Sequence, residues 1–365
     1  MLSWRRIVYI PLLLGITGCG VFQHTDHFSA HEIAFADLSG WAADDQAQAL
    51  QVFTLSCPIL AKKPSAATGS SHIQISQEVW NSICDEALHV PPMNSEQARA
   101  FFERRFTPFR ITNNGKENGL FTGYYEPVLY GSRKKGGDFL YPLYMPPPEL
   151  ESRNLSHEEI DHGGLAKKQL ELVWVDDPVM LFFLQVQGSG RIRFKDGTEM
   201  PIGYAGKNGH NYESLGKIMG DEGLIPKDQI NFFTLRQWLY DHKDKAMQMM
   251  ERNPSYVYFK RGNQLGAVGS VGAVLTKERS LAVDNHYIPY GLPLFLETEL
   301  PSESGSAITF EQTLIAQDTG GAIKGPVRGD IFFGAGDDAE YLAGNMHGRG
   351  IYSLLVPNEI TSQLR

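Results

Sequence analysis

The feature that most constrains this sequence is a glycine-rich stretch between two carboxylates near its C-terminal end. An apolar run over 314–316 leads to Asp318, two glycines follow, and the stretch closes on Asp330 and the apolar residues 331–333. Glycine permits positive φ and close backbone approach, so the pattern predicts two strands joined by a glycine-rich turn. We expect Asp318 and Asp330 at the ends of neighbouring strands. Aspartate is also a common turn residue, which leaves a structural role open for both.

The N-terminal residues resemble a bacterial lipoprotein export signal. Two arginines precede an apolar run over 7–17, which is too short to cross a bilayer as a helix and suits a signal-peptide core. Small residues before Cys19 complete the pattern, so we predict a signal peptide over 1–18, a lipid on Cys19 and a linker over 19–36. Gly20, in place of an aspartate, favours the outer membrane, with the chain anchored on its periplasmic face.

Charge and cysteine content narrow the functional classes. Lys and Arg number 33 against 42 Asp and Glu, and loss of the two arginines of the signal peptide leaves a net charge of −11. This charge argues against nucleic acid as a partner. Export favours a disulfide between Cys57 and Cys84, while two buried thiols are the alternative. The spacing of Cys and His residues does not resemble a metal site, and we expect no metal and no cofactor.

Hydrophobic periodicity divides the chain into helical and extended segments. Helical spacing occurs over 44–54, 76–88 and 95–106, and again over 214–222 and 234–252. About 340 residues remain after processing, which is enough for two domains of ordinary size. Strands joined by glycine and proline turns are predicted over 120–130, 178–187, 191–194 and 256–259, with several short strands over 266–355.

Several blocks of sequence together resemble the membrane-bound lytic transglycosylase A family. Asp284, Asp318 and Asp330 correspond to the three aspartates of the domain found at the C-terminus of that family. The combination of blocks is far more specific than any one of them. The similar blocks cover residues 120–130, 187–190, 202–210, 282–294, 318–325 and 328–334.

The resemblance implies a mainly β fold with α-helices. A double-psi β-barrel with N-terminal helices is expected over 37–126 plus 256–365. A smaller β-rich domain, inserted over 127–255, is expected to form the opposite wall of a groove.

The resemblance also implies where a saccharide binds. On their own, paired tyrosines are common packing residues, and an amide and a hydroxyl beside glycines can simply hold a turn. Glu126 is a second candidate acid, ranked behind the aspartates, and His210 is expected to be structural because no nucleophile is paired with it. The expected substrate-binding residues are Thr122, Tyr124, Gln187, Ser189, Tyr204, Lys207, Asn208 and Asp284.

The activity implied is lytic cleavage of the β-1,4 bond between MurNAc and GlcNAc in peptidoglycan, with formation of 1,6-anhydro-MurNAc. Asp330 is the expected general acid and base, with Asp318 assisting it. A protonated Asp330 needs a raised pKa, which the apolar residues 331–333 and like-charge repulsion from Asp318 are expected to supply. The expected partners are peptidoglycan glycan strands, the membrane through the lipid, and complexes of cell-wall synthesis or division.

Two alternatives stay open from the sequence. An inverting glycoside hydrolase on the same fold would use Asp330 as acid and Asp318 as the base that activates water. A wall-binding lipoprotein without activity would keep the groove and lose the acid. Product mass separates the first from a transglycosylase, because hydrolysis adds one water and anhydro-ring formation adds none.

Overall fold

Strand pairing closes six strands into a ring and attaches two more to its side. The computed structural model describes residues 26–62, 69–262 and 266–365. The strand order is β1-β2-β14-β11-β12-β10-β13-β3, and an additional β3–β14 pairing closes the ring. The β10–β12 and β3–β13 pairs are parallel and the others antiparallel. The strands are β1 (Phe28–Glu32), β2 (Phe106–Asn113), β3 (Gly119–Glu126), β10 (Ser280–Val283), β11 (Pro293–Leu300), β12 (Ile308–Asp318), β13 (Arg328–Ala335) and β14 (His347–Pro357).

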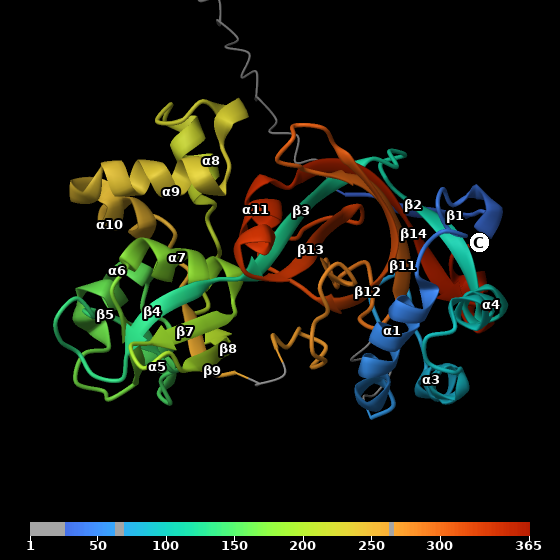
Figure 1. Ribbon diagram of the computed structural model, residues 1–365, viewed down its shortest axis with the longest axis horizontal. Coiled ribbons are helices and arrows are strands. Elements are labelled where there is room, and N and C mark those ends of the chain that lie inside the picture. The colour runs from blue at the N-terminus through green and yellow to red at the C-terminus, as the bar shows by residue number, and fades with distance from the viewer. Residues whose placement is uncertain (1–25, 63–68, 263–265) are drawn as a thin grey trace, which may run out of the picture.

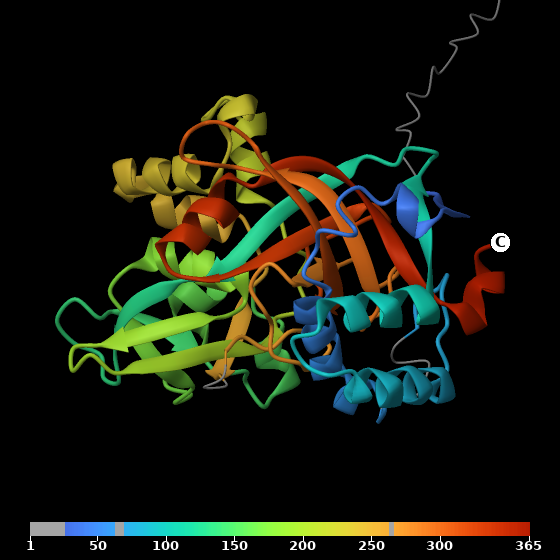
Figure 2. The same ribbon diagram turned by 45° about the vertical axis from the view of Figure 1, so that its right-hand side comes forward.

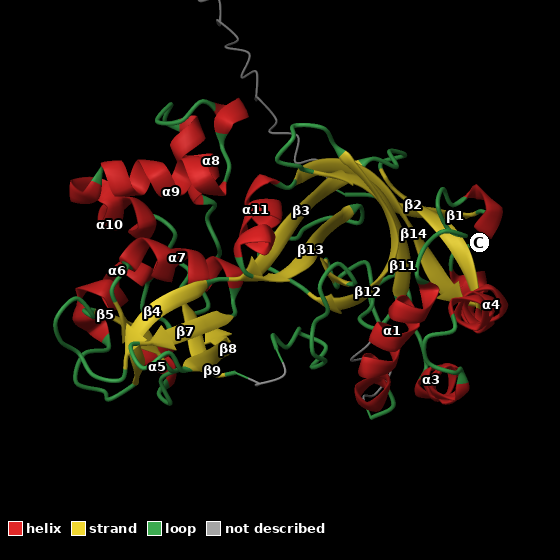
Figure 3. Ribbon diagram, viewed as in Figure 1, coloured by secondary structure: helices red, strands yellow, loops and turns green. Residues whose placement is uncertain are grey.

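A second sheet of six strands lies beside the barrel and carries most of the remaining helices (Figure 1, Figure 3). Its order is β5-β6-β4-β7-β8-β9, from β5 (Tyr141–Tyr144), β6 (Glu171–Val175), β4 (Val128–Ser132), β7 (Gly190–Phe194), β8 (Glu199–Lys207) and β9 (Val257–Arg261). Its helices and helical turns are α5 (Leu150–Arg153), α6 (His157–Glu159), η2 (Ile160–Gly164), α7 (Pro178–Gln187), α8 (Leu215–Asp221), η3 (Lys227–Gln229), α9 (Phe232–Asp241) and α10 (Lys243–Glu251).

The predicted strand over 120–130 is two strands that belong to different sheets. Pro127 separates β3 of the barrel from β4 of the second sheet, so one extended segment connects the two units (Figure 1). A second connection is made by α11 (Asp337–Asn345), whose Glu340 accepts hydrogen bonds from Tyr125 Oη (3.0 Å) and from Arg236 Nη1 of α9 (2.7 Å). Both units are therefore tied together on the side of β3 that carries Tyr125.

Three N-terminal helices pack against the barrel, where Figure 2 shows them in blue and cyan. These are α1 (Gln46–Leu60), α3 (Gln77–His89) and α4 (Ser95–Arg105), and their N-caps are Asp45, Ser76 and Asn94. A side-chain oxygen at each cap accepts an otherwise unpaired backbone N–H of the first turn. The mainly β architecture with a barrel and N-terminal helices confirms the predicted fold class. The short turns η1 (Phe35–Asp37) and η4 (Asn358–Gln363) complete this unit.

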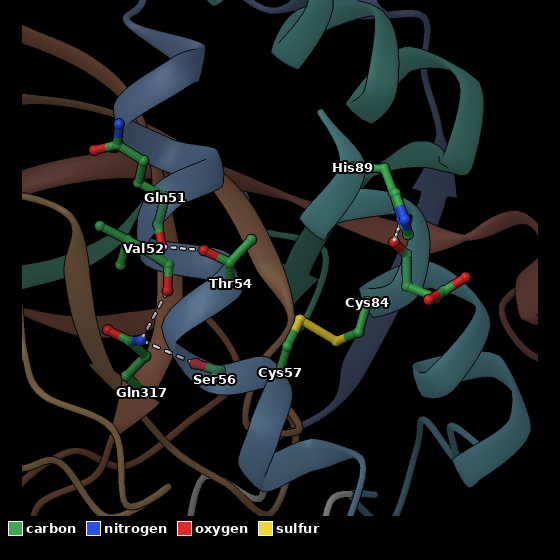
Figure 4. The surroundings of a disulfide bond; sticks show 9 residues. Gln51, Val52, Thr54, Ser56, Cys57, Cys84, His89 and Gln317 are labelled. Atoms are coloured by element: carbon green, nitrogen blue, oxygen red, sulfur yellow. Dashed lines mark hydrogen bonds between the residues drawn. A yellow bond between two sulfur atoms is a disulfide. The ribbon is translucent and has the colours of Figure 1, made fainter. Parts of the chain in front are cut away.

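The predicted disulfide is present between α1 and α3. Cys57 and Cys84 are bonded, with their Cα atoms 5.5 Å apart (Figure 4). One residue before Cys57, Ser56 Oγ accepts a 2.9 Å hydrogen bond from Gln317 Nε2, which also donates to Val52 O at 3.2 Å. Gln317 is fully buried on β12 next to Asp318, so the disulfide-linked helix is bonded directly to the strand that carries this aspartate.

The strand predicted over 178–187 is wrong. This segment is helix α7, capped by the Asp177 carboxylate, with Pro178 in its first turn and Gly188 in the left-handed conformation (φ 79°) at its end. The helix packs both against the sheet and against α9 and α10, so it is apolar on nearly every side and lacks helical periodicity.

Four further expectations need correction. The predicted linker over 19–36 is too long, because residues 28–32 form β1 and pair with β2, where backbone hydrogen bonding outweighs their polar character. The helix predicted over 234–252 is broken at His242, whose ψ is 53°. Helix α11 was predicted as strand; it follows Gly336, which has φ 96°.

The strands of Asp318 and Asp330 are not neighbours, because β10 lies between them. The export signal and Cys19 fall outside the described residues.

Candidate active site

Asp330 and Asp318 lie at one level of the barrel, on the face of the sheet opposite the core. The strand registers place Thr122 opposite Asp330 and place both aspartates opposite Ala282 of β10. Residues directly opposite each other in a sheet share a face, so these side chains converge. Gly329 keeps β13 close to its neighbours, because a Cβ there would lie 3.0 Å from Leu281 and Phe121 atoms.

Only one of the three apolar residues that were predicted to desolvate Asp330 lies on the same face of β13 as its side chain. Ile331 and Phe333 are fully buried in the barrel core, on the opposite face of β13. Phe332 shares the face of Asp330, and its ring centroid is 5.2 Å from that of Tyr124. Of the three apolar residues, Phe332 alone stands on the face where it can desolvate the aspartate, because consecutive side chains point to opposite sides of a strand.

The carboxyl group of Asp330 is held by a hydroxyl that an arginine contacts in turn. Thr122 Oγ1 donates a 2.6 Å hydrogen bond to Asp330 Oδ1, and Arg328 Nη2 donates a 2.8 Å bond to Thr122 Oγ1. Burial raises the pKa of Asp330, and repulsion from the Asp318 charge acts in the same direction. The Arg328 charge and the Thr122 hydrogen bond oppose this rise. The net effect is a pKa of Asp330 above its usual range.

The carboxylate of Asp318 accepts four hydrogen bonds. Its Oδ1 accepts hydrogen bonds from Ser270 N (2.9 Å), Ser270 Oγ (2.7 Å) and Thr319 N (2.9 Å), and its Oδ2 accepts one from Tyr124 Oη (3.0 Å). Burial raises the pKa of Asp318, while these donors lower it. Both oxygens are therefore engaged by the protein itself.

Asp284 supports the glycine-rich loop. Its Oδ2 accepts a 2.9 Å hydrogen bond from Gly325 N, and its Oδ1 accepts one from His286 N at 3.1 Å. Gly325 has φ 103°, a conformation that favours glycine. The Asp284 side chain, which was predicted to bind substrate, is buried and bonded at both oxygens, so it fixes the loop.

The structure separates the predicted saccharide residues of the second unit into two groups. Gln187 Oε1 accepts a hydrogen bond from Tyr125 N at 3.0 Å, and Ser189 is buried at the end of α7. Tyr204 and Lys207 are exposed on β8 and free to meet a ligand.

Asn208, a predicted substrate-binding residue, is buried and engaged within the protein. It is 1% exposed, its Nδ2 donates to Leu155 O (2.8 Å) and Pro254 O (2.7 Å), and its Oδ1 accepts from Tyr256 N (2.9 Å). These bonds join Asn208 to Leu155 and to residues 254–256, so its amide holds parts of the second unit together.

Two other sequence expectations concern possible acids and bases. Glu126 is buried, and its Oε2 lies 3.6 Å from Arg191 Nη2; burial raises its pKa while Arg191 lowers it. Glu126 therefore has an arginine as its direct ion-pair partner, whereas Asp330 meets Arg328 only through the Thr122 hydroxyl. His210 Nε2 contacts Asn154 O at 2.8 Å, as expected for a structural residue.

Sequence reasoning missed three residues of the site. Arg328 precedes Asp330 by two positions, so strand alternation places it on the same face and would have identified it. Ser270 reaches Asp318 from a loop that carries no distinctive pattern. Tyr212 lies against the glycine-rich loop, since a Cβ on Gly321 would be 3.5 Å from the Tyr212 Cβ. The second unit therefore borders the aspartates.

Comparisons with known proteins agree with this arrangement. Residues 120–260 match the model of the MltA specific insert domain, and residues 279–355 match that of the 3D domain. A crystal structure of a membrane-bound lytic murein transglycosylase from Agrobacterium tumefaciens aligns with a TM-score of 0.81 and 32% identity, over 92% of this chain and 100% of that one. The chain belongs to the membrane-bound lytic murein transglycosylase A family.

Other members of this family show how far the similarity extends. Membrane-bound lytic murein transglycosylase A of Escherichia coli K12 is 37% identical over 238 residues, which cover 64% of this chain and 64% of that protein. The matched stretch thus spans less than two thirds of this curated relative. The crystal structure of E. coli MltA with bound chitohexaose aligns with a TM-score of 0.69 and 29% identity, over 90% of this chain and 95% of that one.

Membership of the lytic transglycosylase A family confirms the resemblance seen in the sequence. Across the residues that the structure describes, no helix is long and apolar enough to cross a membrane. Within the same ranges, His, Cys, Asp and Glu side chains form no cluster of three or more that could hold a metal ion.

Proposed function

We propose that this protein is a lytic transglycosylase that cleaves the β-1,4 bond between MurNAc and GlcNAc in peptidoglycan and forms 1,6-anhydro-MurNAc. One observation carries the proposal. Among the hydrogen bonds of the described residues, those of Asp318 and Asp284 engage both carboxyl oxygens, whereas those of Asp330 engage Oδ1 alone. The site thus offers one carboxyl oxygen for chemistry.

A single carboxyl group suits this reaction. Most glycosidases need a second carboxylate, as nucleophile or to activate water. In a transglycosylase the C6 hydroxyl of the muramyl residue is the internal nucleophile, so a second carboxylate is not required, and a unimolecular step benefits from proximity. Asp330 would protonate the glycosidic oxygen as the bond to C1 breaks, and would take the proton of O6 as the new O6–C1 bond forms.

The hydrogen bonds of Asp318 argue against an inverting hydrolase. A base that activates water takes up a proton from it, and the four donors on Asp318 stabilise its ionised form and so lower its affinity for a proton. Asp318 instead acts on Asp330 through its charge, which helps to keep the acid protonated.

Glycan strands are the proposed substrate, and the crystal structure of E. coli MltA with bound chitohexaose supports a groove that accepts amino-sugar polymers. Exposed Tyr204 and Lys207 on β8 are proposed to contact the strand. We further propose lipid anchoring through Cys19 on the periplasmic face of the outer membrane. The name of the E. coli relative, which describes it as membrane-bound, supports an anchored protein.

Mass spectrometry of soluble products tests the proposal. Purified protein lacking residues 1–18 is incubated with peptidoglycan sacculi, together with Asp330→Asn and with Asp337→Asn, which alters an exposed aspartate of α11. Muropeptides lighter by one water than hydrolytic products are expected from the parent and from Asp337→Asn. Loss of a general acid typically costs about 10²–10⁴-fold, so Asp330→Asn should release almost none. Free reducing ends would identify a hydrolase, and no turnover would leave a wall-binding protein.

A further inference from the structure

The contacts around Asp330 determine which of its oxygens can carry a proton. Arg328 has only donors, so its 2.8 Å contact with Thr122 uses a lone pair of the threonine hydroxyl. That hydroxyl has a single proton, and among the described residues its two hydrogen-bond partners are Arg328 and Asp330. The proton of Thr122 therefore points to Asp330 Oδ1, at 2.6 Å.

The reverse arrangement leaves a hydroxyl proton without an acceptor. If Asp330 Oδ1 carried the proton and donated to Thr122, the threonine hydroxyl would receive two donors and its own proton would have no partner among the described groups. An unmatched polar group in a partly buried site costs free energy. The arrangement with Oδ1 as acceptor is therefore favoured.

The fold builds this chain of contacts from strand pairing. Arg328 and Asp330 alternate along β13 on one face, and Thr122 stands opposite Asp330 on the parallel strand β3. Arg328 is fixed by further bonds from Nη1 to the carbonyl oxygens of Leu120 and Gly329. Its guanidinium contacts Asp330 through the hydroxyl and forms no direct ion pair with a carboxylate of the described chain within 4.0 Å.

Placing a neutral hydroxyl between the two charges has a chemical consequence. A direct ion pair would strongly favour the ionised carboxylate, and Asp330 would then lose its acid proton. With the hydroxyl between them, Arg328 acts at a longer distance and the proton can stay. When Asp330 gives up its proton, the same chain donates to the new carboxylate.

We propose that Arg328 and Thr122 are positioning residues that keep Oδ1 of Asp330 as a hydrogen-bond acceptor and so place the acid proton on Oδ2. This inference rests on the proposed function. Oδ2 then delivers the proton to the glycosidic oxygen as the C1–O bond breaks, and recovers a proton from O6 of the muramyl residue as the O6–C1 bond forms, so that no proton is gained or lost.

The test compares Thr122→Val with Thr122→Ser. Valine keeps the shape of threonine and removes the hydroxyl, whereas serine keeps the hydroxyl. Release of anhydro-muropeptides is measured across pH for both variants and the parent, with thermal unfolding as the check on folding. We expect Thr122→Val to lose about tenfold or more in kcat with little change in KM, and Thr122→Ser to recover most of it.

The pH profile provides a readout that a merely structural role would not move. The Thr122 hydrogen bond lowers the pKa of Asp330, so its removal raises this pKa and shifts the alkaline limb of kcat/KM to higher pH. Arg328→Met should shift the limb in the same direction. Because both residues act through one chain of contacts, the double variant Thr122→Val/Arg328→Met should be about as impaired as the worse single variant.

Each result decides the inference separately from the proposed function. A folded Thr122→Val variant with parental kcat and an unmoved alkaline limb overturns the proton assignment, even if the parent forms anhydro products. Fully additive effects of the two substitutions overturn it as well. Hydrolytic products from the parent would refute the proposed function, while the same variants would still test where the acid proton lies. If Arg328→Met fails to fold, the comparison of Thr122→Val with Thr122→Ser still tests the proton assignment.

Discussion

Asp318 and Asp330 lie on opposite sides of β10, and each stands directly opposite Ala282. Adjacent strands are about 4.8 Å apart, so the two Cα atoms are separated by about 10 Å. Their side chains share one face of the sheet, yet their hydrogen bonding differs. Both oxygens of Asp318 accept hydrogen bonds, from Ser270, Thr319 and Tyr124. Among the described residues, Asp330 accepts a hydrogen bond at Oδ1 alone.

Replacing Asp318 should leave less of Asp330 protonated near neutral pH and so slow the reaction, without changing the product. Asp318→Asn removes a negative charge that raises the pKa of Asp330, so this pKa falls and the alkaline limb of the pH–rate profile moves to lower pH. We expect about a tenfold loss of rate near neutral pH. Mass spectrometry should still find anhydro-muropeptides. A loss as complete as that of Asp330→Asn would instead indicate that Asp318 is a base.

The buried carboxyl group of Asp161 should make stability depend on pH. Burial raises the pKa of Asp161 from 3.8 to about 7; the nearby Glu251 charge adds to the rise and His162 opposes it. Since the folded pKa exceeds the unfolded one, the stabilisation it provides is complete below about pH 4 and is lost as the pH rises to about 7.

Asp161→Asn removes this titration. Each pKa unit corresponds to about 1.4 kcal/mol, so the variant should gain about 2–4 kcal/mol relative to the parent between pH 4 and pH 7. Urea unfolding at several pH values measures the difference. Asp138→Asn, at an exposed position of the same unit, serves as the control. A constant difference across this pH range would show that Asp161 titrates normally.

Removing the disulfide should destabilise the barrel unit. The Cys57–Cys84 bond closes a segment with a sequence separation of 27, and a bond of this kind typically contributes about 2–4 kcal/mol. Cys57→Ser/Cys84→Ser should therefore unfold at a lower urea concentration. Treating the parent with a reductant should reproduce the loss, and the reductant should leave the double variant unchanged. Equal stability of the parent and the double variant would contradict the prediction.

Alanine substitutions of Asn208 and Lys207 should differ in their effect on the free energy of unfolding, although the two residues are adjacent. Asn208→Ala removes the hydrogen bonds of the Asn208 amide to Leu155 O, Pro254 O and Tyr256 N, at a cost of about 2–4 kcal/mol in the free energy of unfolding. Lys207→Ala alters an exposed side chain and should change it by less than about 0.5 kcal/mol. Chemical denaturation measures both. Normal stability of Asn208→Ala would contradict the structural role of its amide.

The sequence by itself determined the three aspartates, the family resemblance, the three N-terminal helices and the disulfide partners. These features are local: a cap beside a periodic segment, or a glycine-rich block around a carboxylate, is visible in adjacent residues. Strand alternation also places Arg328 and Asp330 on one face without any knowledge of the fold.

Only the tertiary structure showed how the hydrogen bonding of the three aspartates differs. Besides the adjacent Thr319 N, the partners of Asp318 come from β3 and from the loop containing Ser270, and besides His286 N, Asp284 is bonded to the glycine-rich loop. No pattern within β12 records these contacts, because hydrogen bonding between distant segments depends on how the strands pair. The same reason explains Asn208, whose amide bonds to Leu155 and to residues 254–256, and α7, whose burial on several sides removes the periodicity that marks a helix.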